Sequence, residues 1–277
     1  MAGYSDLISN ASLQIYEYGI HMNNEMRTIG RRVPFYVMSY IKEGKAQLRL
    51  DGKTIPLAPK SVILIPPDTT HDHIKIGKDS TLFMWWHFDY KLYETIDLLK
   101  LLGMPLVFEL AEAASFESAF SNYANAMKLP VTLQNTILKK ANALTIMAHL
   151  LGAAEGGRNV LRLSMPDCFR EMLVIILNSS EPDLTLSSFA KRFNMHPTYL
   201  SNRFKQYYGI SPIALHRKVL LRRARDMLGM QGMSVAEVAE LLGYKSASVF
   251  SRFFTKKTGY PPSHIITSAR DRQSEQF

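Results

Sequence analysis

Short apolar runs separated by turn residues fill the first ninety residues of the chain, and this pattern predicts β-strands. The runs cover residues 33–41, 46–50, 54–57, 61–65, 71–76 and 81–88. Asp51-Gly52, between two of these runs, is typical of a tight hairpin turn. Strands this short, and this close together, predict a small antiparallel barrel or sandwich.

After Tyr90 the apolar period changes, and helices are predicted over residues 91–102, 112–127 and 133–151. The last of these helices has an apolar stripe at spacings of four and three. The stripe consists of Ile137, Ala141, Leu144, Ala148 and Leu151. Such a stripe fits equally well against the strands or against a second chain. Residues 152–164 contain three glycines and no clear period, which predicts a linker.

Composition suggests two globular domains, and charge distinguishes them. The chain has 277 residues, 47% of them hydrophobic and 21% charged, with a formal net charge of +9. Residues 1–164 carry 17 Lys and Arg against 15 Asp and Glu, whereas residues 165–277 carry 16 against 9. The excess positive charge therefore lies in the second half, where nucleic acid or an anionic membrane surface could attract it.

Several features of the sequence indicate the cellular compartment. No stretch of about 18 apolar residues occurs, so no membrane span is expected. The first nineteen residues lack the features of a signal peptide. The lone Cys168 excludes an intrachain disulfide and a Cys-based zinc cluster. We therefore expect a cytoplasmic protein.

The basic half contains an internal repeat. At an offset of 49 residues, Leu186 matches Val235 and Ala190 matches Ala239; after the next turn the offset becomes 50, and Phe204 matches Phe254. In the first unit Thr185 or Ser187 caps a short helix, Asn194 suits a left-handed turn, and a second helix follows to Gly209. The second unit has Ser234, Gly243 and Gly259 in the same places. This layout predicts two helix-turn-helix units, over about 184–209 and 234–259, joined by a basic helix over 212–228.

The alternative interpretation of the repeat is a plain helical bundle with a solvated basic face, and one unit alone would not exclude it. A helix-turn-helix presents its second helix to the DNA major groove, so its short outward side chains can read base edges. The outward polar positions are Thr198, Ser201, Asn202, Ser248, Ser251 and Arg252. The basic residues that suit phosphate contacts are Lys205, Arg222, Lys256 and Lys257.

Two segments of this half resemble the DNA-binding domain of the AraC/XylS family of bacterial transcription regulators. They read LTLSSFAKRFNMHPTYLSNRFKQYYGISP and SVAEVAELLGYKSASVFSRFFTKKTGYPPSHI. In the first, Arg203 stands where the family often has an apolar residue. The resemblance adds Ala247 to the base-contacting positions and implies that Arg252 reads guanine. It also implies promoter DNA and RNA polymerase as partners, with the bacterial nucleoid as the place of action.

The first half resembles the family's cupin-like sensor barrel through SVILIPPDTTHDH and FMWWHFD. The two resemblances together imply an α+β protein of two domains. Residues 1–151 would form an antiparallel β-barrel whose helical segment, 112–151, couples the domains or forms a homodimer. Residues 152–164 would be the linker, and residues 165–277 an all-α domain with both helix-turn-helix units.

A ligand pocket is predicted in the first half. Phe83, Trp85 and His87 alternate along one strand and so share a face, where aromatic rings beside polar groups suit a sugar or a similar small polar molecule. The family resemblance adds Lys42 and His73. The alternative is that these aromatic side chains only fill the barrel interior.

No cofactor is expected. His71 and His73 could face one metal ion, but the carboxylate that metal-binding cupins place about four residues later is missing, because Gly77 and Lys78 stand there. We therefore expect a sequence-specific transcription regulator that acts as an activator and responds to a sugar or related metabolite. The alternatives are a cupin-type isomerase or dioxygenase, and an architectural nucleic-acid-binding protein without a sensor.

Overall fold

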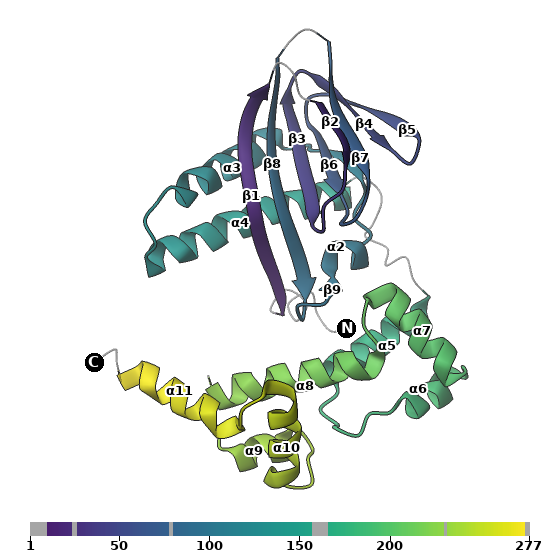
Figure 1. Ribbon diagram of the computed structural model, residues 1–277, viewed down its shortest axis with the longest axis vertical. Coiled ribbons are helices and arrows are strands. Elements are labelled where there is room, and N and C mark those ends of the chain that lie inside the picture. Colours follow the sequence, from purple (N-terminus) through teal and green to yellow (C-terminus); the bar gives the residue numbers. More distant parts are fainter. Residues whose placement is uncertain (1–9, 24–26, 78–79, 157–165, 230–231, 275–277) are drawn as a thin grey trace. The chain divides into compact units, whose positions relative to one another are not determined.

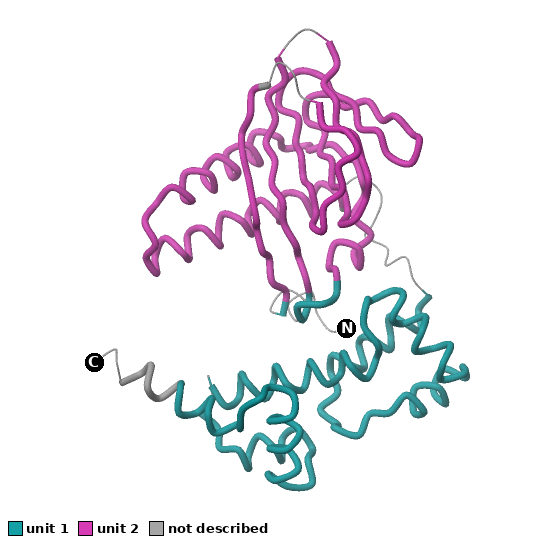
Figure 2. Tube along the Cα trace, in the orientation of Figure 1, with its two compact units in different colours: residues 1–10, 92–96, 165–277 teal, residues 11–91, 97–164 magenta. Residues whose placement is uncertain are grey.

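The computed structural model describes residues 10–23, 27–77, 80–156, 166–229 and 232–274 (Figure 1). The chain divides into two compact units, shown in different colours in Figure 2. The β-rich unit comprises residues 11–91 and 97–164. The helical unit comprises residues 165–277 together with 1–10 and 92–96.

The described strands of the β-rich unit form two sheets. The first has the order β1-β8-β3-β6-β10, with β9 paired to β8, and the second has the order β2-β7-β4-β5. The strands of the first sheet are β1 (Ala11–Asn23), β3 (Tyr36–Glu43), β6 (Ser61–Ile65), β8 (Thr81–Leu92), β9 (Ile96–Asp97) and β10 (Val107–Glu109). The strands of the second are β2 (Arg27–Arg31), β4 (Lys45–Leu50), β5 (Lys53–Leu57) and β7 (His71–Ile76).

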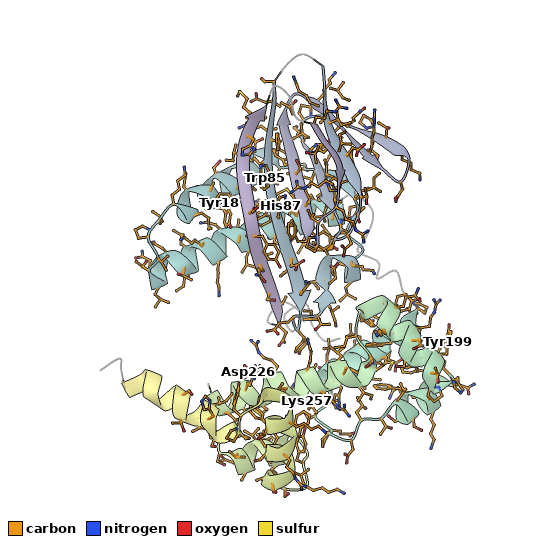
Figure 3. All side chains as sticks on the ribbon, viewed as in Figure 1. Tyr18, Trp85, His87, Tyr199, Asp226 and Lys257 are labelled. Atoms are coloured by element: carbon orange, nitrogen blue, oxygen red, sulfur yellow. The ribbon has the colours of Figure 1, made fainter. Side chains whose placement is uncertain are left out.

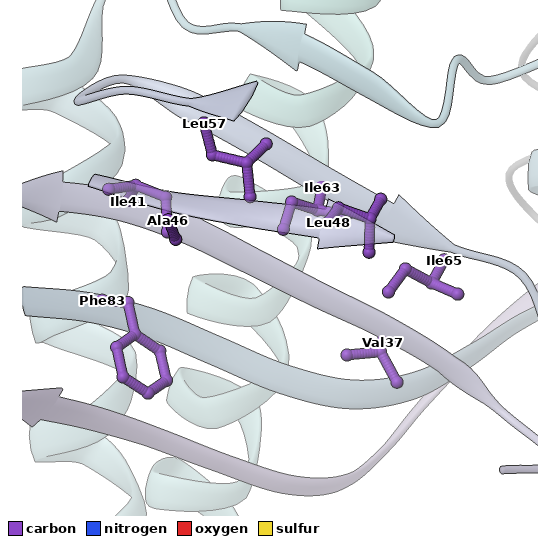
Figure 4. Packing of buried hydrophobic residues seen from close by; sticks show 8 residues of the cluster. All are labelled: Val37, Ile41, Ala46, Leu48, Leu57, Ile63, Ile65 and Phe83. Carbon is purple, nitrogen blue, oxygen red and sulfur yellow. The ribbon is translucent and has the colours of Figure 1, made fainter. Parts of the chain in front are cut away.

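An apolar core joins the strands of both sheets (Figure 4). Its buried members are Val37, Ile41, Ala46, Leu48, Leu57, Ile63, Ile65 and Phe83. Six of them lie on one face of β3, β4 or β6, because successive side chains of a strand point to opposite faces, and Leu57 and Phe83 come from β5 and β8. The β-rich fold class is confirmed, with two sheets in place of one closed barrel.

Helices cover the opposite face of the first sheet. These are the short α2 (Leu98–Leu101), α3 (Ala113–Met127) and α4 (Leu133–Gly156). Trp86 on β8 meets Phe120 and Tyr123 of α3 edge-on, and Tyr40 on β3 meets Phe116 of α3. Because helices cover one face and the core the other, β6 is buried at every position.

The structure differs from the sequence-based interpretation in three places. No strand was predicted before residue 33, yet β1 and β2 lie there. The predicted helix over 91–102 is mostly not helical, since β8 continues to Leu92 and only Leu98–Leu101 forms a helix. Tyr93 and Glu94 turn the chain with φ of 50° and 58°, which a helix does not allow. The predicted linker began too early, because α4 runs on to Gly156; residues 157–164 lie outside the described part.

The apolar stripe predicted on α4 faces away from the unit. Ile137, Ala141, Leu144 and Ala148 are exposed and Leu151 is half-buried. The buried residues of α4 are Ala143, Ile146, Met147, Leu150 and Ala154, on the side that packs against α3 and β10. Four of the five stripe residues therefore lie outside the core of their own chain.

The helical unit is built around one long helix. Its helices are α5 (Asp167–Asn178), α6 (Leu186–Phe193), α7 (Pro197–Tyr208), α8 (Pro212–Gly229), α9 (Val235–Leu241), α10 (Ala247–Thr258) and α11 (Pro262–Ser274). Leu220, Ala224 and Leu228 of α8 join the core of the second helix pair. Among the described residues, no helix combines the length and apolarity needed to cross a bilayer.

Candidate functional site

The first helix-turn-helix has the predicted caps. Thr185 Oγ1 accepts a hydrogen bond from Ser188 N and begins α6. Asn194 ends this helix in the left-handed region with φ 49°, and Pro197 occupies the first turn of α7. Gly209 ends α7 with φ 74°. These residues suit their positions, because Asn and Gly tolerate a left-handed backbone and the first turn of a helix does not need the N–H group that Pro lacks.

The second unit has the same arrangement, with an additional hydrogen bond at the beginning of its first helix. Ser234 and Glu237 form a reciprocal capping box at the beginning of α9. Gly243 makes the left-handed turn with φ 70°, and Ser246 caps α10 by accepting from Val249 N. Gly259 ends α10 with φ 84°.

The predicted base-reading residues lie on the outward side of α7 and α10. Leu200 and Phe204 of α7, like Phe250 and Phe254 of α10, are fully buried, which fixes the opposite side as the solvent face. Thr198, Asn202, Ser248 and Arg252 are exposed, while Ser201, Ala247 and Ser251 are half-buried at its margins. Lys205, Lys256 and Lys257 are also exposed. Each second helix therefore presents short polar side chains with lysines further along.

Sequence reasoning did not single out two apolar side chains on these outward faces. Tyr199 on α7 and Val249 on α10 are 51% and 40% exposed, and they occupy corresponding positions at the repeat offset of 50 (Figure 3 labels Tyr199). Their pairing in the repeat was the signal that could have found them, because apolar side chains can contact a thymine methyl group.

Two basic residues that the sequence singled out, Arg203 and Arg222, have partners within the chain. Arg203, the departure from the family pattern, is half-buried and donates to Gln206 Oε1 over 2.7 Å, with its guanidinium near the rings of Tyr199 and Tyr207. Arg222, a predicted phosphate contact, pairs with Asp226 on the same helix at 3.3 Å. A phosphate would have to compete with this carboxylate for Arg222.

The β-rich unit contains an open pocket of about 350 Å³, within the range of roughly 300–1,000 Å³ typical of small-molecule sites. It draws side chains from five strands. The lining residues are Glu17, His21, Arg27, Thr28, Arg31, Val37, Ser39, His73, Phe83, Trp85 and His87. Four of the five predicted ligand residues, His73, Phe83, Trp85 and His87, are thus brought together. Figure 3 labels Trp85 and His87 within this unit.

Aromatic rings form one part of the pocket wall. The ring of Trp85 lies 4.6 Å from that of His87 between centroids, and His21 meets both Phe83 and Trp85 edge-on. This arrangement follows from the alternation along β8, which sends Phe83, Trp85 and His87 to the pocket and Trp86 to α3.

A hydrogen-bonded chain of three side chains crosses the pocket. Arg31 Nη2 donates to His87 Nε2 at 3.1 Å, and His87 Nδ1 donates to Glu17 Oε2 at 3.0 Å. A ring nitrogen that accepts from a guanidinium carries no proton, so His87 is neutral. Burial and the nearby Arg31 lower the pKa of His87, which agrees with this assignment although the Glu17 carboxylate acts in the opposite direction.

Two buried polar atoms in the pocket wall have no hydrogen-bond partner within the described structure. They are Ser39 Oγ and His73 Nε2, whose residues are 2% and 9% exposed. Burial, followed by His71 and Arg31, lowers the pKa of His73 to about 4, so this side chain is also neutral near pH 7. Leaving buried polar groups unpaired costs free energy that a polar ligand or ordered water can recover.

Lys42, the fifth predicted ligand residue, is not in the pocket. It forms an ion pair with Glu117 of α3 at 2.9 Å, and the same carboxyl group accepts a hydrogen bond from Tyr40. Because Tyr40 and Lys42 are two residues apart on β3, they share the face that packs against the helix, while Ser39 points to the pocket.

Sequence reasoning missed the pocket residues of the first two strands. Glu17 and His21 come from β1, and Arg27, Thr28 and Arg31 come from β2. The period-two alternation of ASLQIYEYGIHMN was the available signal for β1. No comparable signal marked the charged β2, whose RTIGR sequence is mostly exposed.

The two histidines that were weighed as metal ligands, His71 and His73, have different surroundings. Only His73 lines the pocket, while His71 Nδ1 contacts the Thr69 carbonyl oxygen at 3.0 Å. Within the part of the chain that the structure describes, no three His, Cys, Asp or Glu side chains gather in a group that could hold a metal ion.

Two family models match the chain. The model of the AraC-like ligand binding domain matches residues 15–151, and the model of a helix-turn-helix domain matches residues 189–268. The first match contains the described lining of the pocket, and the second contains α7 and α10.

Curated relatives are similar over most of their length. The Msm operon regulatory protein of Streptococcus mutans is 21% identical over 92% of this chain and 93% of its own. The raffinose operon transcriptional regulatory protein RafR of Pediococcus pentosaceus is 22% identical over 84% and 85%, respectively. The arabinose operon regulatory protein of Escherichia coli is 21% identical over 87% and 83%. With its sensor sheets and its paired helix-turn-helix units, the chain belongs to the AraC/XylS family of transcription regulators and is a DNA-binding regulator, not an enzyme.

Proposed function

We propose that the protein activates transcription of a carbohydrate operon when a sugar binds the pocket between its two sheets. The observation that carries this proposal is the pocket wall, where the Trp85 ring lies beside the unpartnered Ser39 Oγ and His73 Nε2. A sugar offers hydroxyl groups for such polar atoms and an apolar C–H face for an aromatic ring. Two relatives that are named as raffinose and arabinose operon regulators support the same class of ligand.

The pocket needs no metal or other cofactor in this proposal. Its neutral histidines and aromatic rings are groups that bind a ligand directly through hydrogen bonds and packing. The two units keep the domain roles expected from the sequence, with ligand binding in the first and promoter recognition in the second. Such a regulator acts at the promoter, so we place its work at the bacterial nucleoid, with RNA polymerase as a partner.

Ligand binding is tested by the fluorescence of the two tryptophans in the full-length protein, because only Trp85 lines the pocket while Trp86 is fully buried against α3. Titration with a panel of sugars should change the emission at a saturable concentration. Trp85→Ala should abolish the response and leave promoter binding intact. A saturable response that survives this substitution would place the ligand elsewhere.

Activation is tested separately from ligand binding. A promoter whose DNA the protein binds is fused to a reporter gene, and transcription is measured with and without the sugar that changes the fluorescence. The proposal expects more transcript only when both protein and sugar are present. A drop in transcript on adding the protein would make it a repressor.

A homodimer is part of the proposal, supported by the outward face of α4. Ile137, Ala141, Leu144 and Ala148 form an exposed stripe, and Leu133, one turn earlier, is 80% exposed. A continuous apolar stripe in water marks an association surface, and its spacing of four and three suits helix-to-helix packing.

Sedimentation of two variants tests the dimer. Ile137→Glu places a charge in the centre of the stripe and should shift the full-length protein toward monomer. Thr145→Glu, an exposed position of the same helix beside the stripe, is the matched control and should sediment like the parent protein. Equal behaviour of the two variants would contradict the α4 interface.

A further inference from the structure

Among the described residues that line the pocket, positive charge exceeds negative charge. These residues include two guanidinium groups, of Arg27 and Arg31, and one carboxylate, that of Glu17. Two of the described histidines in the lining add no positive charge near pH 7. His73 and His87 are buried with lowered pKa values and are neutral near pH 7.

The Glu17 carboxylate is already engaged. Glu17 Oε2 accepts from His87 Nδ1, and His87 in turn accepts from Arg31 Nη2. His87 thus separates the carboxylate from the arginine, so Glu17 and Arg31 do not form a direct bidentate pair. A guanidinium has five N–H donors in a planar fork, and the contact with His87 uses one of its two terminal nitrogens.

Arg31 is also held in place. It is half-buried, and besides its bond to His87 its charge contributes to the lowered pKa of both His71 and His73. In the pairing of β2 with β7, Arg31 lies opposite His71. A fixed, partly desolvated guanidinium is the arrangement that proteins use to bind carboxylate and phosphate oxygens.

We propose that the effector is an acidic sugar, a hexuronate, whose carboxylate binds Arg31 while the sugar ring lies against Trp85. Ser39 Oγ and His73 Nε2 bind its hydroxyl groups, and Arg27 at the rim adds attraction for the negative charge. This inference rests on the proposed function, because it assigns a charge to the sugar that the pocket was proposed to bind. Arg31 is then the residue that distinguishes acidic from neutral sugars.

The test compares ligands that share the sugar ring and differ in the group, and hence the charge, at C6. Galacturonate and glucuronate, their methyl esters, and the neutral parents galactose and glucose are titrated into the full-length protein, with calorimetry and tryptophan emission as readouts. The ester keeps the ring and its hydroxyl groups but removes the negative charge. We expect at least one uronate to bind about 10- to 100-fold more tightly than its ester and its parent sugar.

Matched variants test whether the charge of Arg31 is responsible for the preference for the uronate. Arg31→Gln should reduce the uronate preference to near unity, whereas Arg32→Gln should preserve it, because Arg32 is exposed, does not line the pocket and pairs with Asp68. Arg31→Lys keeps the charge and loses the fork, so it should retain part of the preference. Circular dichroism checks that each variant is folded, and the ester comparison needs no variant at all.

The outcomes separate this inference from the function on which it rests. Tight binding of a neutral sugar or an ester, with no gain for the uronate, would overturn the acidic-sugar assignment and leave sugar binding in place. Binding of none of these ligands, nor of any sugar in a wider panel, would overturn both. A uronate preference that persists in Arg31→Gln would overturn the role of Arg31.

Discussion

Asn194 and Gly243 adopt the same left-handed backbone conformation, with φ of 49° and 70°, at the turns of the two helix-turn-helix units. The two residues differ in what surrounds them. A Cβ at position 243 would lie 3.1 Å from Pro182 Cδ, whereas Asn194 already accommodates a full side chain. One turn geometry is thus achieved by two residue types that tolerate it for different reasons.

Gly243→Ala should destabilise the helical unit by about 1–2 kcal/mol, because the new Cβ adds backbone strain and crowds Pro182. Asn194→Gly should change the free energy of unfolding by less than about 1 kcal/mol, since glycine takes the same conformation. Urea unfolding followed by far-ultraviolet circular dichroism measures both. Wild-type stability of Gly243→Ala would show that this turn can relax.

Arg252→Ala should weaken binding to the cognate site by about 1–3 kcal/mol and relax specificity at one base pair. The reason is that Arg252 is exposed on the outward face of α10, where a guanidinium can bind guanine with two hydrogen bonds. Fluorescence anisotropy on the cognate duplex and its single-base variants measures the effect.

Lys256→Ala is the comparison for Arg252 on the same helix. It should weaken binding to all sequences alike and reduce the slope of log affinity against log salt by about 1, as expected for a lost phosphate contact. If Arg252→Ala also weakens every sequence equally, then Arg252 binds phosphate and does not read a base.

Lys42→Met should leave ligand affinity unchanged, because Lys42 pairs with Glu117 on the helix side of the first sheet. The pair is partly exposed, so its loss should cost no more than about 1 kcal/mol of stability. Calorimetric titration beside the pocket variant Trp85→Ala provides the contrast. A loss of binding in Lys42→Met would show that α3 and the pocket are coupled.

The β-rich unit should lose stability as the pH falls from 7 toward 4. Folding lowers the pKa of His73 from its ordinary 6.5 to about 4, so the unfolded chain binds more protons throughout this interval. Stability conferred by neutral His73 is therefore full above pH 6.5 and lost as the pH falls, by at most about 3 kcal/mol. His71 and His87 shift in the same direction and add to the trend.

Tryptophan emission during urea unfolding isolates this effect, because both tryptophans lie on β8 of the β-rich unit. In His73→Gln, the urea concentration at the midpoint of unfolding should depend less strongly on pH than in the parent protein. Identical midpoints at pH 7 and pH 5 in the parent protein would contradict the neutral, buried state of His73.

The sequence alone determined the helix-turn-helix pair, down to its caps and turns. Thr185, Asn194, Ser234 and Gly243 act through hydrogen bonds and backbone angles within a few residues of themselves, so their effects can be read in order along the chain. The alternation along β8 likewise predicted that Trp85 and Phe83 point to the same face of the sheet.

The pocket and the orientation of α4 were decided only by tertiary structure. Arg31, Ser39 and His73 come from three strands, and they meet because the two sheets pack face to face. Alternation says that Lys42 and Ser39 point to opposite faces, but only the packing of α3 decides which face is the pocket. The physical reason is that the hydrophobic pattern of a segment shows only its period. What packs on each face of that segment is decided by residues far away in the sequence.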